Sequence, residues 1–507
     1  HSQLESFNRL WKDQESGIRV YSISNALKAE ILKIHQGVGA PIAPQDLFEN
    51  TKETINMGDD FYIPLALEWE SGKYAHQGEA VEAWEKNGRK GILSIATGGG
   101  KTITALICAQ RLFNEVGSLH ILIAVPTRVL AEQWKNECRS FGLASVDIEL
   151  DSSVKDRIAQ ISDNIDAVRL GISSVEVSIL LNNTLADVDF QTCMSRAGIN
   201  QLLIADECHN LGSERLLASL PTGVSWRLGL SATPIRQYDT EGTEALLKYF
   251  DGSIYDFGLS QAIGICLVPY EYYIHPTYLN EDESREVSRL SKRISLLNAI
   301  KEGRSQAQNE ELKMLQMRRA RVIESAQDKL VVFEHIFNKL PEDNRRLSII
   351  FCSSKETSQL DEVQCILNKN RSKYRRVTQV ESGSKQMLRS IIEDFRERRI
   401  DILVAKKVLD EGANIPEIEN AFFLGSTSTE REWIQRRGRV LRKSQGKSLA
   451  RIHDFICLPH PDYSDACRAV YQRELKRCIE FSDYSCNRFD ANGGRMCLER
   501  LRSKYNF

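Results

Sequence analysis

A short glycine-rich segment has the residue types and spacing that bind the phosphates of a nucleotide. It consists of Ala96, Thr97, Gly98, Gly99, Gly100, Lys101 and Thr102. The glycines allow a tight turn whose backbone N–H groups face an anion, and a helix starting there adds a favourable dipole. Lys101 would reach the β- and γ-phosphates, and Thr102 would hold Mg²⁺. Because Ile95 replaces the first glycine of the usual G-x-x-x-x-G-K-[ST] pattern, a plain glycine-rich turn stays open as the alternative.

Two adjacent carboxylates follow a second apolar run. Asp206 and Glu207 come directly after Gln201–Ala205, which predicts a buried strand. In a parallel sheet, ligands bind beyond the carboxyl ends of the strands. There Asp206 would bind Mg²⁺, and Glu207 would position and activate the attacking water. An exposed acidic turn is the other interpretation, and the phosphate-binding pattern upstream disfavours it.

The elements that carry these residues alternate between apolar strands and helical segments. Strands are predicted at 91–95, 120–125, 201–205, 347–352, 401–405 and 420–424. Continuous apolar runs separated by helices indicate parallel sheets covered on both faces. We therefore expect an α/β fold with two RecA-like parallel-sheet domains in tandem, a helical connector and a helical C-terminal segment. The predicted divisions are 1–60 (helical segment), 61–265 (ATP-binding domain), 266–335 (connector), 336–460 (second domain) and 461–507 (C-terminal extension).

Composition bounds the class of protein. Of 507 residues, 42% are hydrophobic and 27% charged, as in ordinary globular proteins, and the length suggests about three domains. A formal net charge of −2 argues against a passive nucleic-acid coating protein, but not against a motor that grips phosphates locally. Twelve cysteines without a C-x-x-C pair favour reduced thiols and a cytoplasmic protein. No secretory signal or membrane-spanning run is visible.

Six motifs in order resemble those of the superfamily 2 helicases, and the resemblance spans both α/β domains. Gln77 stands where the family has an adenine-reading glutamine, and 126–128 resembles its nucleic-acid backbone motif. Ser231 and Thr233 lie in a Ser-Ala-Thr motif that couples hydrolysis to strand movement. The residues to which the resemblance assigns a role are Gln77, Pro126, Thr127, Arg128, Ser231, Thr233, Gly412, Asn414, Gln435, Arg439 and Arg442.

In the second domain the resemblance implies that Gly412 and Asn414 lie in a motif at the ATP site, although Asp is common where Asn414 stands. It implies that Gln435 contributes to catalysis and that Arg439 and Arg442 are the arginine-finger candidates. Such arginines typically raise the rate of phosphoryl transfer by about 10³–10⁵. A solvated basic helix end is the alternative for this arginine-rich run.

The resemblance favours double-stranded DNA as the partner. The Asp-Glu-Cys-His sequence at 206–209 also occurs in duplex-RNA sensors, so it does not select DNA. The segment 435–442 resembles that of excision-repair, phage recombination and restriction-enzyme motors, and the connector is shorter than the helical insertion of the RNA sensors. Segments 7–11, 17–21, 26–28 and 473–481 look like those of bacterial helicases that follow a phospholipase-D-like nuclease, some linked to phosphorothioate-DNA restriction. A nuclease domain or defence-system protein is therefore an expected partner.

Three functional hypotheses follow. The first is an ATP- and Mg²⁺-dependent DNA helicase or duplex translocase in defence, restriction or repair. The second is a nucleic-acid sensor in which ATP gates a conformation, and the sequence does not separate the two. The third, a pseudo-ATPase, is disfavoured because Lys101, Asp206, Glu207, Arg439 and Arg442 are all present.

Several weaker signals have bland interpretations. Four cysteines near the C-terminus lack metal-site spacing and are interpreted as ordinary thiols. Basic clusters at 371–376, 396–399 and 318–321 fit phosphate contacts or solvated charge equally well. Trp134 is expected in the core rather than as a wedge that stacks on a base.

Overall fold

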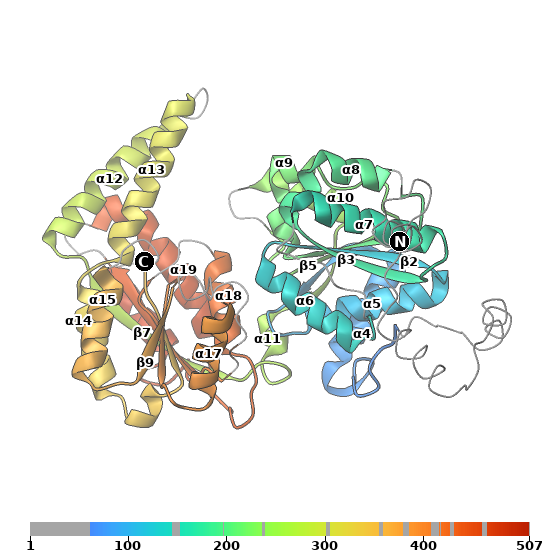
Figure 1. Cartoon of the computed structure of the whole chain (residues 1–507). Helices are drawn as coiled ribbons and strands as arrows, with labels where there is room; N and C mark the ends of the chain where they lie inside the picture. The colour runs from blue at the N-terminus through green and yellow to red at the C-terminus, as the bar shows by residue number, and fades with distance from the viewer. Residues whose placement is uncertain are drawn as a thin grey trace, which may run out of the picture.

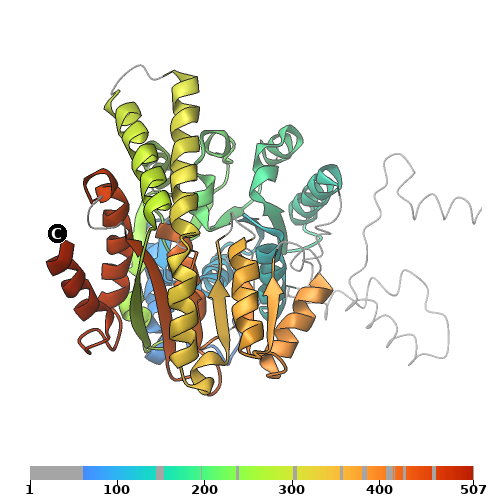
Figure 2. The ribbon, with the colours of Figure 1, turned by 90° about the vertical axis from the view of Figure 1, so that its left-hand side faces the viewer.

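The computed structural model describes residues 61–143, 153–195, 197–235, 239–300, 305–353, 358–378, 385–406, 415, 417–425, 430–458 and 464–505. The helical segment predicted at 1–60 lies outside these residues, as do Gly412 and Asn414. Two α/β domains lie side by side, and a pair of long helices projects from the second (Figures 1 and 2).

The first domain is built on a six-stranded parallel sheet in the order β3-β2-β4-β5-β1-β6. Its strands are β1 (Lys90–Ile95), β2 (Leu119–Val125), β3 (Val175–Leu181), β4 (Gln201–Asp206), β5 (Trp226–Ser231) and β6 (Ser253–Phe257). Every residue of β2 and β4 is buried, which explains why their sequences do not alternate. Because all the strands are parallel, the ends of β1, β4 and β5 meet at one edge of the sheet.

Helices cover both faces of this sheet. They are α4 (Ala75–Lys86), α5 (Lys101–Val116), α6 (Arg128–Ser140), α7 (Val154–Arg169), α8 (Val188–Ser195), α9 (Glu214–Leu217), α10 (Thr240–Phe250) and α11 (Leu259–Ala262), with 3₁₀ turns at Gly72–Tyr74, Asn182–Ala186 and Cys208–Gly212. Helix α7 begins in a capping box, in which Ser153 accepts from the backbone of Asp156 and the Asp156 side chain accepts in return. Helix α6 is capped by Thr127, whose hydroxyl accepts from the backbone of Leu130.

The second domain has a parallel sheet in the order β7-β12-β11-β8-β10-β9. Its strands are β7 (Tyr270–Tyr278), β8 (Ser348–Phe351), β9 (Tyr374–Val377), β10 (Ile402–Ala405), β11 (Asn420–Phe423) and β12 (Ala450–Leu458). Its helices are α14 (Asp328–Lys339), α15 (Ser358–Lys369), α17 (Lys385–Arg396), α18 (Glu430–Val440), α19 (Ser464–Asp483) and α20 (Gly494–Tyr505), with a 3₁₀ turn at Glu342–Arg345. The two tandem parallel-sheet domains confirm the predicted fold class.

The range predicted as a helical connector, 266–335, begins with a strand instead. β7 pairs along its whole length with β12 and forms an edge of the second sheet. Pro276 lacks an N–H for a sheet hydrogen bond, and a sheet edge is where a strand tolerates proline. The rest of the range holds the projecting hairpin of α12 (Glu281–Ala299) and α13 (Gln306–Glu324), which packs through Ile294, Leu297 and Leu312.

The C-terminal helices pack on this added strand. The Tyr270 hydroxyl donates to the carbonyl of Phe481 at 2.7 Å, and the backbone of Tyr272 donates to Asn487 at 2.9 Å. A buried ion pair joins Arg477 of α19 to Asp454 of β12. The predicted C-terminal extension is thus helical and belongs to the second domain.

Candidate ATP site between the two domains

The glycine-rich loop connects β1 to α5. Gly98 and Gly100 have φ values of +87° and +86°, a region that favours glycine. A Cβ at Gly100 would also collide with the amide of Gln77, and one at Gly99 would press against Ile95. Helix α5 begins at Lys101, so its unpaired N–H groups open toward the loop. The loop therefore keeps a tight glycine turn at the start of α5, although Ile95 replaces the first glycine of the usual pattern.

Helix α4 braces this loop from outside. The His76 Nε2 atom lies 2.8 Å from the carbonyl oxygen of Gly99, and its ring stacks on Phe257 at 3.9 Å. The side chain of Gln77 is buried beside Gly100. The sequence analysis predicted Gln77 as a site residue but did not predict His76. The only sequence signal for His76 was that it directly precedes Gln77.

The three charged residues predicted for phosphate chemistry lie together. Lys101 donates from Nζ to Oε1 of Glu207 at 2.9 Å. Burial favours a neutral amine, but the charges of Glu207 and Asp206 outweigh it and raise the pKa of Lys101. Burial also raises the pKa of Asp206, more than the Lys101 ammonium lowers it. The Asp206 carboxylate therefore depends on a nearby cation to remain charged.

Both oxygens of Asp206 accept hydrogen bonds. Trp134 of α6 donates from Nε1 to Oδ2 at 2.9 Å, and the backbone N–H of Glu207 donates to Oδ1 at 2.9 Å. Glu207 itself has a left-handed backbone, with φ +46°. This conformation is uncommon for a residue other than glycine and turns the chain directly after β4.

His209 lies between Glu207 and the end of β5. Nδ1 of His209 lies 3.5 Å from Oε2 of Glu207 and 2.9 Å from the hydroxyl oxygen of Ser231. That hydroxyl accepts from the backbone N–H of Thr233 at 3.1 Å. Ser231 and Thr233, the predicted coupling residues, are therefore linked to the acid pair, although His209 was not among the predicted site residues.

Helix α18 of the second domain faces the glycine-rich loop. A cavity of about 750 Å³ is lined from the first domain by Gln77, Thr97, Gly98, Gly99, Gly100, Lys101, Thr102, Pro126, Asp206 and Glu207, and from the second by Gln435, Arg439 and Arg442. A Cβ on Gly438 would overlap the hydroxyl of Thr97. The backbone N–H of Val268 donates to the carbonyl of Leu441, and Leu267 bridges to Arg442. The two domains thus meet at the cavity.

The arginines of α18 and of the turn that follows it divide into two groups. Arg439 and Arg442 line the cavity; burial and the neighbouring Arg439 lower the pKa of Arg442 to about 10, so it stays charged at neutral pH. Arg437 turns away, pairs with Glu480 of α19 at 2.8 Å and lies over the ring of Phe481. Arg436 donates to the carbonyl of Gly425. The alternative of a solvated basic helix end does not fit, because Arg436 and Arg437 are each 3% exposed.

Pro126, Thr127 and Arg128 follow β2 at the same edge of the sheet. Pro126 lines the cavity, Thr127 caps α6, and Arg128 is exposed. Contact of these residues with a nucleic acid remains a prediction.

The residues present fit a nucleotide with Mg²⁺. The glycine turn leaves a cradle that a Cβ would fill, the start of α5 favours an anion, and Lys101 supplies a buried cation. Thr102 and the Asp206 carboxylate provide the oxygen ligands that Mg²⁺ prefers. When bound, the metal would neutralise phosphate charge and make an ionised Asp206 more favourable.

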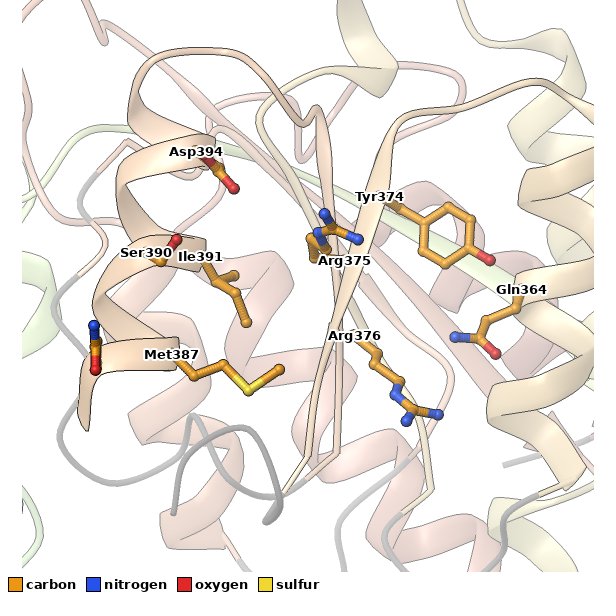
Figure 3. Close-up of a pocket in the computed structure, with 9 residues that line it drawn as sticks. Gln364, Tyr374, Arg375, Arg376, Met387, Ser390, Ile391 and Asp394 are labelled. Atoms are coloured by element: carbon orange, nitrogen blue, oxygen red, sulfur yellow. The ribbon is translucent and has the colours of Figure 1, made fainter. Parts of the chain in front are cut away.

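A second cavity, of about 770 Å³, lies between the edge strand β9 and α17 (Figure 3). Tyr374, Arg375 and Arg376 line one side, and Met387 and Ile391 lie opposite. The predicted basic cluster at 371–376 therefore borders a cavity.

Two other observations concern metals and membranes. Within the described ranges, no group of three or more His, Cys, Asp or Glu residues is arranged to hold a metal ion. The same ranges contain no helix with the length and apolar character needed to cross a bilayer.

Comparisons with known proteins agree with this arrangement. Residues 72–236 match the family "Type III restriction enzyme, res subunit", and residues 328–444 match "Helicase conserved C-terminal domain". The DNA 3'-5' translocase XPB2 of Sulfurisphaera tokodaii is 25% identical over 392 residues, covering 74% of this chain and 79% of that protein. The Dicer-like protein 2 of Neurospora crassa is 27% identical over 125 residues, covering 23% of this chain and 8% of that protein.

A solved structure, the ATP-dependent Type ISP restriction-modification enzyme LlaBIII bound to DNA, has a similar fold. Its TM-score is 0.52 at 16% sequence identity, and the match covers 79% of this chain and 29% of that chain. The described chain therefore corresponds to less than a third of that enzyme.

Proposed function

We propose that this chain, an ATP-dependent enzyme of the superfamily 2 helicases that resembles restriction and repair motors, is a DNA-stimulated ATPase that moves along double-stranded DNA. Hydrolysis would depend on closure of its two domains, and relative motion of the domains would advance the protein on its track.

One observation carries this proposal: Arg439 and Arg442 of the second domain line the same cavity as Lys101, Asp206 and Glu207 of the first. A single domain therefore lacks part of the catalytic set. Charge that develops on the transferred phosphoryl group needs cations, and these two guanidiniums can supply them only when α18 is seated on the loop.

The other roles follow from position. Lys101 and the backbone of 98–100 would hold the phosphates, Gln77 would read the base, and Thr102 with Asp206 would hold Mg²⁺. Glu207 would orient and activate water, and Gln435 would support the same reaction. Ser231 and Thr233 would couple a change at Asp206 and Glu207 during hydrolysis to movement of the rest of the domain. Pro126, Thr127 and Arg128 would contact the phosphate backbone of the nucleic acid. Gly412 and Asn414, which lie outside the described residues, keep their sequence-based assignment to the ATP site.

Two comparisons support DNA as the proposed substrate, and the resemblance of 435–442 to repair and restriction motors favours the duplex. The archaeal relative that covers most of this chain is named a DNA translocase, and the first-domain family is that of a restriction subunit. The fungal relative with a Dicer-like name matches a much shorter segment. A role in bacterial or phage defence, restriction or repair, in the cytoplasm and with a nuclease domain or defence protein as partner, belongs to the same proposal.

Steady-state ATP hydrolysis without nucleic acid, and with duplex DNA, single-stranded DNA or duplex RNA, tests the proposal at fixed salt, because nucleic-acid affinity depends steeply on salt. We expect the largest stimulation by duplex DNA. If only duplex RNA stimulates hydrolysis, the protein is an RNA-dependent enzyme and not a DNA motor. If only single-stranded DNA stimulates hydrolysis, the protein translocates on a single strand and does not track the duplex.

The second candidate is a duplex nucleic-acid sensor in which ATP gates a conformation. A sensor should bind ATP in a nucleic-acid-dependent manner but should not move along the duplex. It would therefore not displace a third strand that is bound to the duplex as a triplex. A triplex-displacement assay with ATP, compared with the same assay on Lys101→Ala, separates the motor from the sensor.

A further inference from the structure

Trp134 joins helix α6 to the acid pair. Its indole is 1% exposed, Asp206 is 5% exposed, and the indole N–H donates to Oδ2 of that carboxylate at 2.9 Å. Since the backbone of Glu207 holds the other oxygen, both Asp206 oxygens have a fixed direction. A carboxylate oxygen accepts more than one hydrogen bond or metal contact, so each keeps capacity for Mg²⁺ or a metal-bound water.

Helix α6 connects two parts of the proposed machinery. It begins at the exposed Arg128, directly after its cap Thr127, and Trp134 follows six residues later, about 9 Å along the helix axis. Leu130 and Gln133 of the same helix line the cavity. A helix of this length moves as one rigid body. A displacement of the start of α6 would therefore also displace the Trp134 indole, which donates to Asp206.

A purely structural role for Trp134 has a comparison within the same domain. Trp84 of α4 is also fully buried, and its indole N–H donates to the backbone carbonyl of Arg227 at 3.1 Å. That bond satisfies a buried polar group and touches no residue of the cavity lining. Trp134 differs because its partner is a carboxylate at the site, where a donor to a charged acceptor is stronger and fixes orientation.

We propose that Trp134 is a positioning residue, which orients Asp206 toward Mg²⁺ and transmits movement of α6, caused by nucleic acid at Thr127 and Arg128, to that carboxylate. This inference rests on the proposed function. It assigns no chemistry to the indole itself; the effect acts through the direction of the Asp206 oxygens.

The test compares Trp134→Phe with Trp84→Phe, since each removes one buried indole donor and keeps an aromatic ring. ADP affinity is measured by calorimetry with Mg²⁺ and with EDTA. We expect the ratio of the two affinities to fall about tenfold in Trp134→Phe and to stay unchanged in Trp84→Phe. In hydrolysis assays, Trp134→Phe should also require more Mg²⁺ for half-maximal rate and show a smaller stimulation by duplex DNA. If both variants depend on Mg²⁺ to the same degree, Trp134 has only a packing role and does not position Asp206.

A measurement on the unaltered protein covers the case in which Trp134→Phe does not fold. The chain has six tryptophans, so ¹⁵N-labelled tryptophan gives six indole N–H signals. Mn²⁺ with ADP should broaden the signal of the indole bonded to Asp206 more than the others, and duplex DNA without nucleotide should shift that same signal. Absence of the shift would overturn the transmission step. If the unaltered chain binds ADP without any dependence on Mg²⁺ and no nucleic acid stimulates it, the proposed function fails, and this inference fails with it.

Discussion

The ammonium of Lys101 and the carboxylate of Glu207 form an ion pair with 2.9 Å between Nζ and Oε1, although the two residues have different proposed tasks. Their side chains are only 11% and 13% exposed, so the pair compensates two largely desolvated charges. A bound γ-phosphate would compete with Glu207 for Lys101. Nucleotide binding would thereby free the Glu207 carboxylate to face water.

The Glu207→Gln substitution tests this competition. Because glutamine is a weaker partner for Lys101, we expect ATP affinity equal to or higher than that of the unaltered protein. We expect the hydrolysis rate to fall by about 10²–10⁴, the usual contribution of a positioned acid–base group. Equilibrium binding of a fluorescent ATP analogue and steady-state turnover measure the two effects. Loss of ATP binding would instead mark Glu207 as a structural residue.

The Lys101→Ala substitution should have the opposite effect on binding. It removes the main cation for the phosphates and leaves Glu207 and Asp206 without their compensating charge. We expect turnover to be abolished and ATP affinity to drop, while circular dichroism remains that of the folded protein. Turnover close to that of the unaltered protein would contradict the assignment of the phosphate loop.

Contact between the domains is tested at Gly438. An alanine there would overlap the hydroxyl of Thr97, so α18 could not seat on the glycine-rich loop. We expect Gly438→Ala to lower the rate of hydrolysis by about 10²-fold or more while ATP binding by the first domain is retained, since misplaced catalytic groups cost about this much. Gly223→Ala is the matched control, because a Cβ there meets nothing within 4 Å and the backbone is not left-handed. Equal rates for the two variants would argue against hydrolysis at this domain contact.

The two cavity arginines should act on rate rather than on binding. Arg439→Ala and Arg442→Ala are each expected to reduce turnover by about 10³-fold, the lower end of arginine-finger effects, with little change in the affinity for ATP. Arg451→Ala is the control, since Arg451 pairs with Glu271 on the second sheet and does not line the cavity. Single-turnover hydrolysis measures the chemical step directly. A variant that loses only ATP affinity would have its arginine reassigned to ground-state binding.

Much of the fold could be predicted because its signals are local. The buried strands β2 and β4 are continuous apolar runs, and the loop before Lys101 owes its form to glycines at positive φ. Strand β7 was missed although its four tyrosines favour a strand. Pro276 interrupts the run, and its pairing partner β12 lies about 180 residues away in the chain.

The functional residues show the same limit. Lys101, Asp206 and Glu207 stand in short recognisable segments, whereas the contacts of Trp134 and Arg437 depend on residues distant in the chain. The sequence treated Trp134 as core, and it is buried, but its hydrogen bond to Asp206 spans 72 positions. The resemblance singled out Arg439, but the place of Arg437 is set by packing: it pairs with Glu480 of α19 and lies over Phe481. Side-chain direction on a helix is set by what the helix packs against.

His120 is fully buried at the start of β2. Its Nε2 lies 2.8 Å from the Ser178 hydroxyl, and its Nδ1 lies 3.1 Å from the Gln201 amide nitrogen. Because the amide must donate to Nδ1, the imidazole is neutral, and burial lowers its pKa to about 4 from an ordinary value of 6.5. Between these values the unfolded chain binds more protons than the folded one. The free energy of unfolding should therefore fall as pH drops from 6.5 to 4, with a slope approaching about 1.4 kcal/mol per pH unit from this residue.

The His120→Gln variant isolates that contribution. Glutamine does not titrate, so the difference in unfolding free energy between the unaltered protein and the variant should shrink as the pH falls through this window, while all other titrating groups cancel. At pH 7 the variant should be less stable by about 1–3 kcal/mol, because its amide cannot satisfy both Ser178 and Gln201 in the same geometry. Urea unfolding at pH 7, 6, 5 and 4 measures the difference. A difference that is constant with pH would show that His120 titrates alike in the folded and unfolded chains, which is incompatible with a neutral imidazole held between two strands.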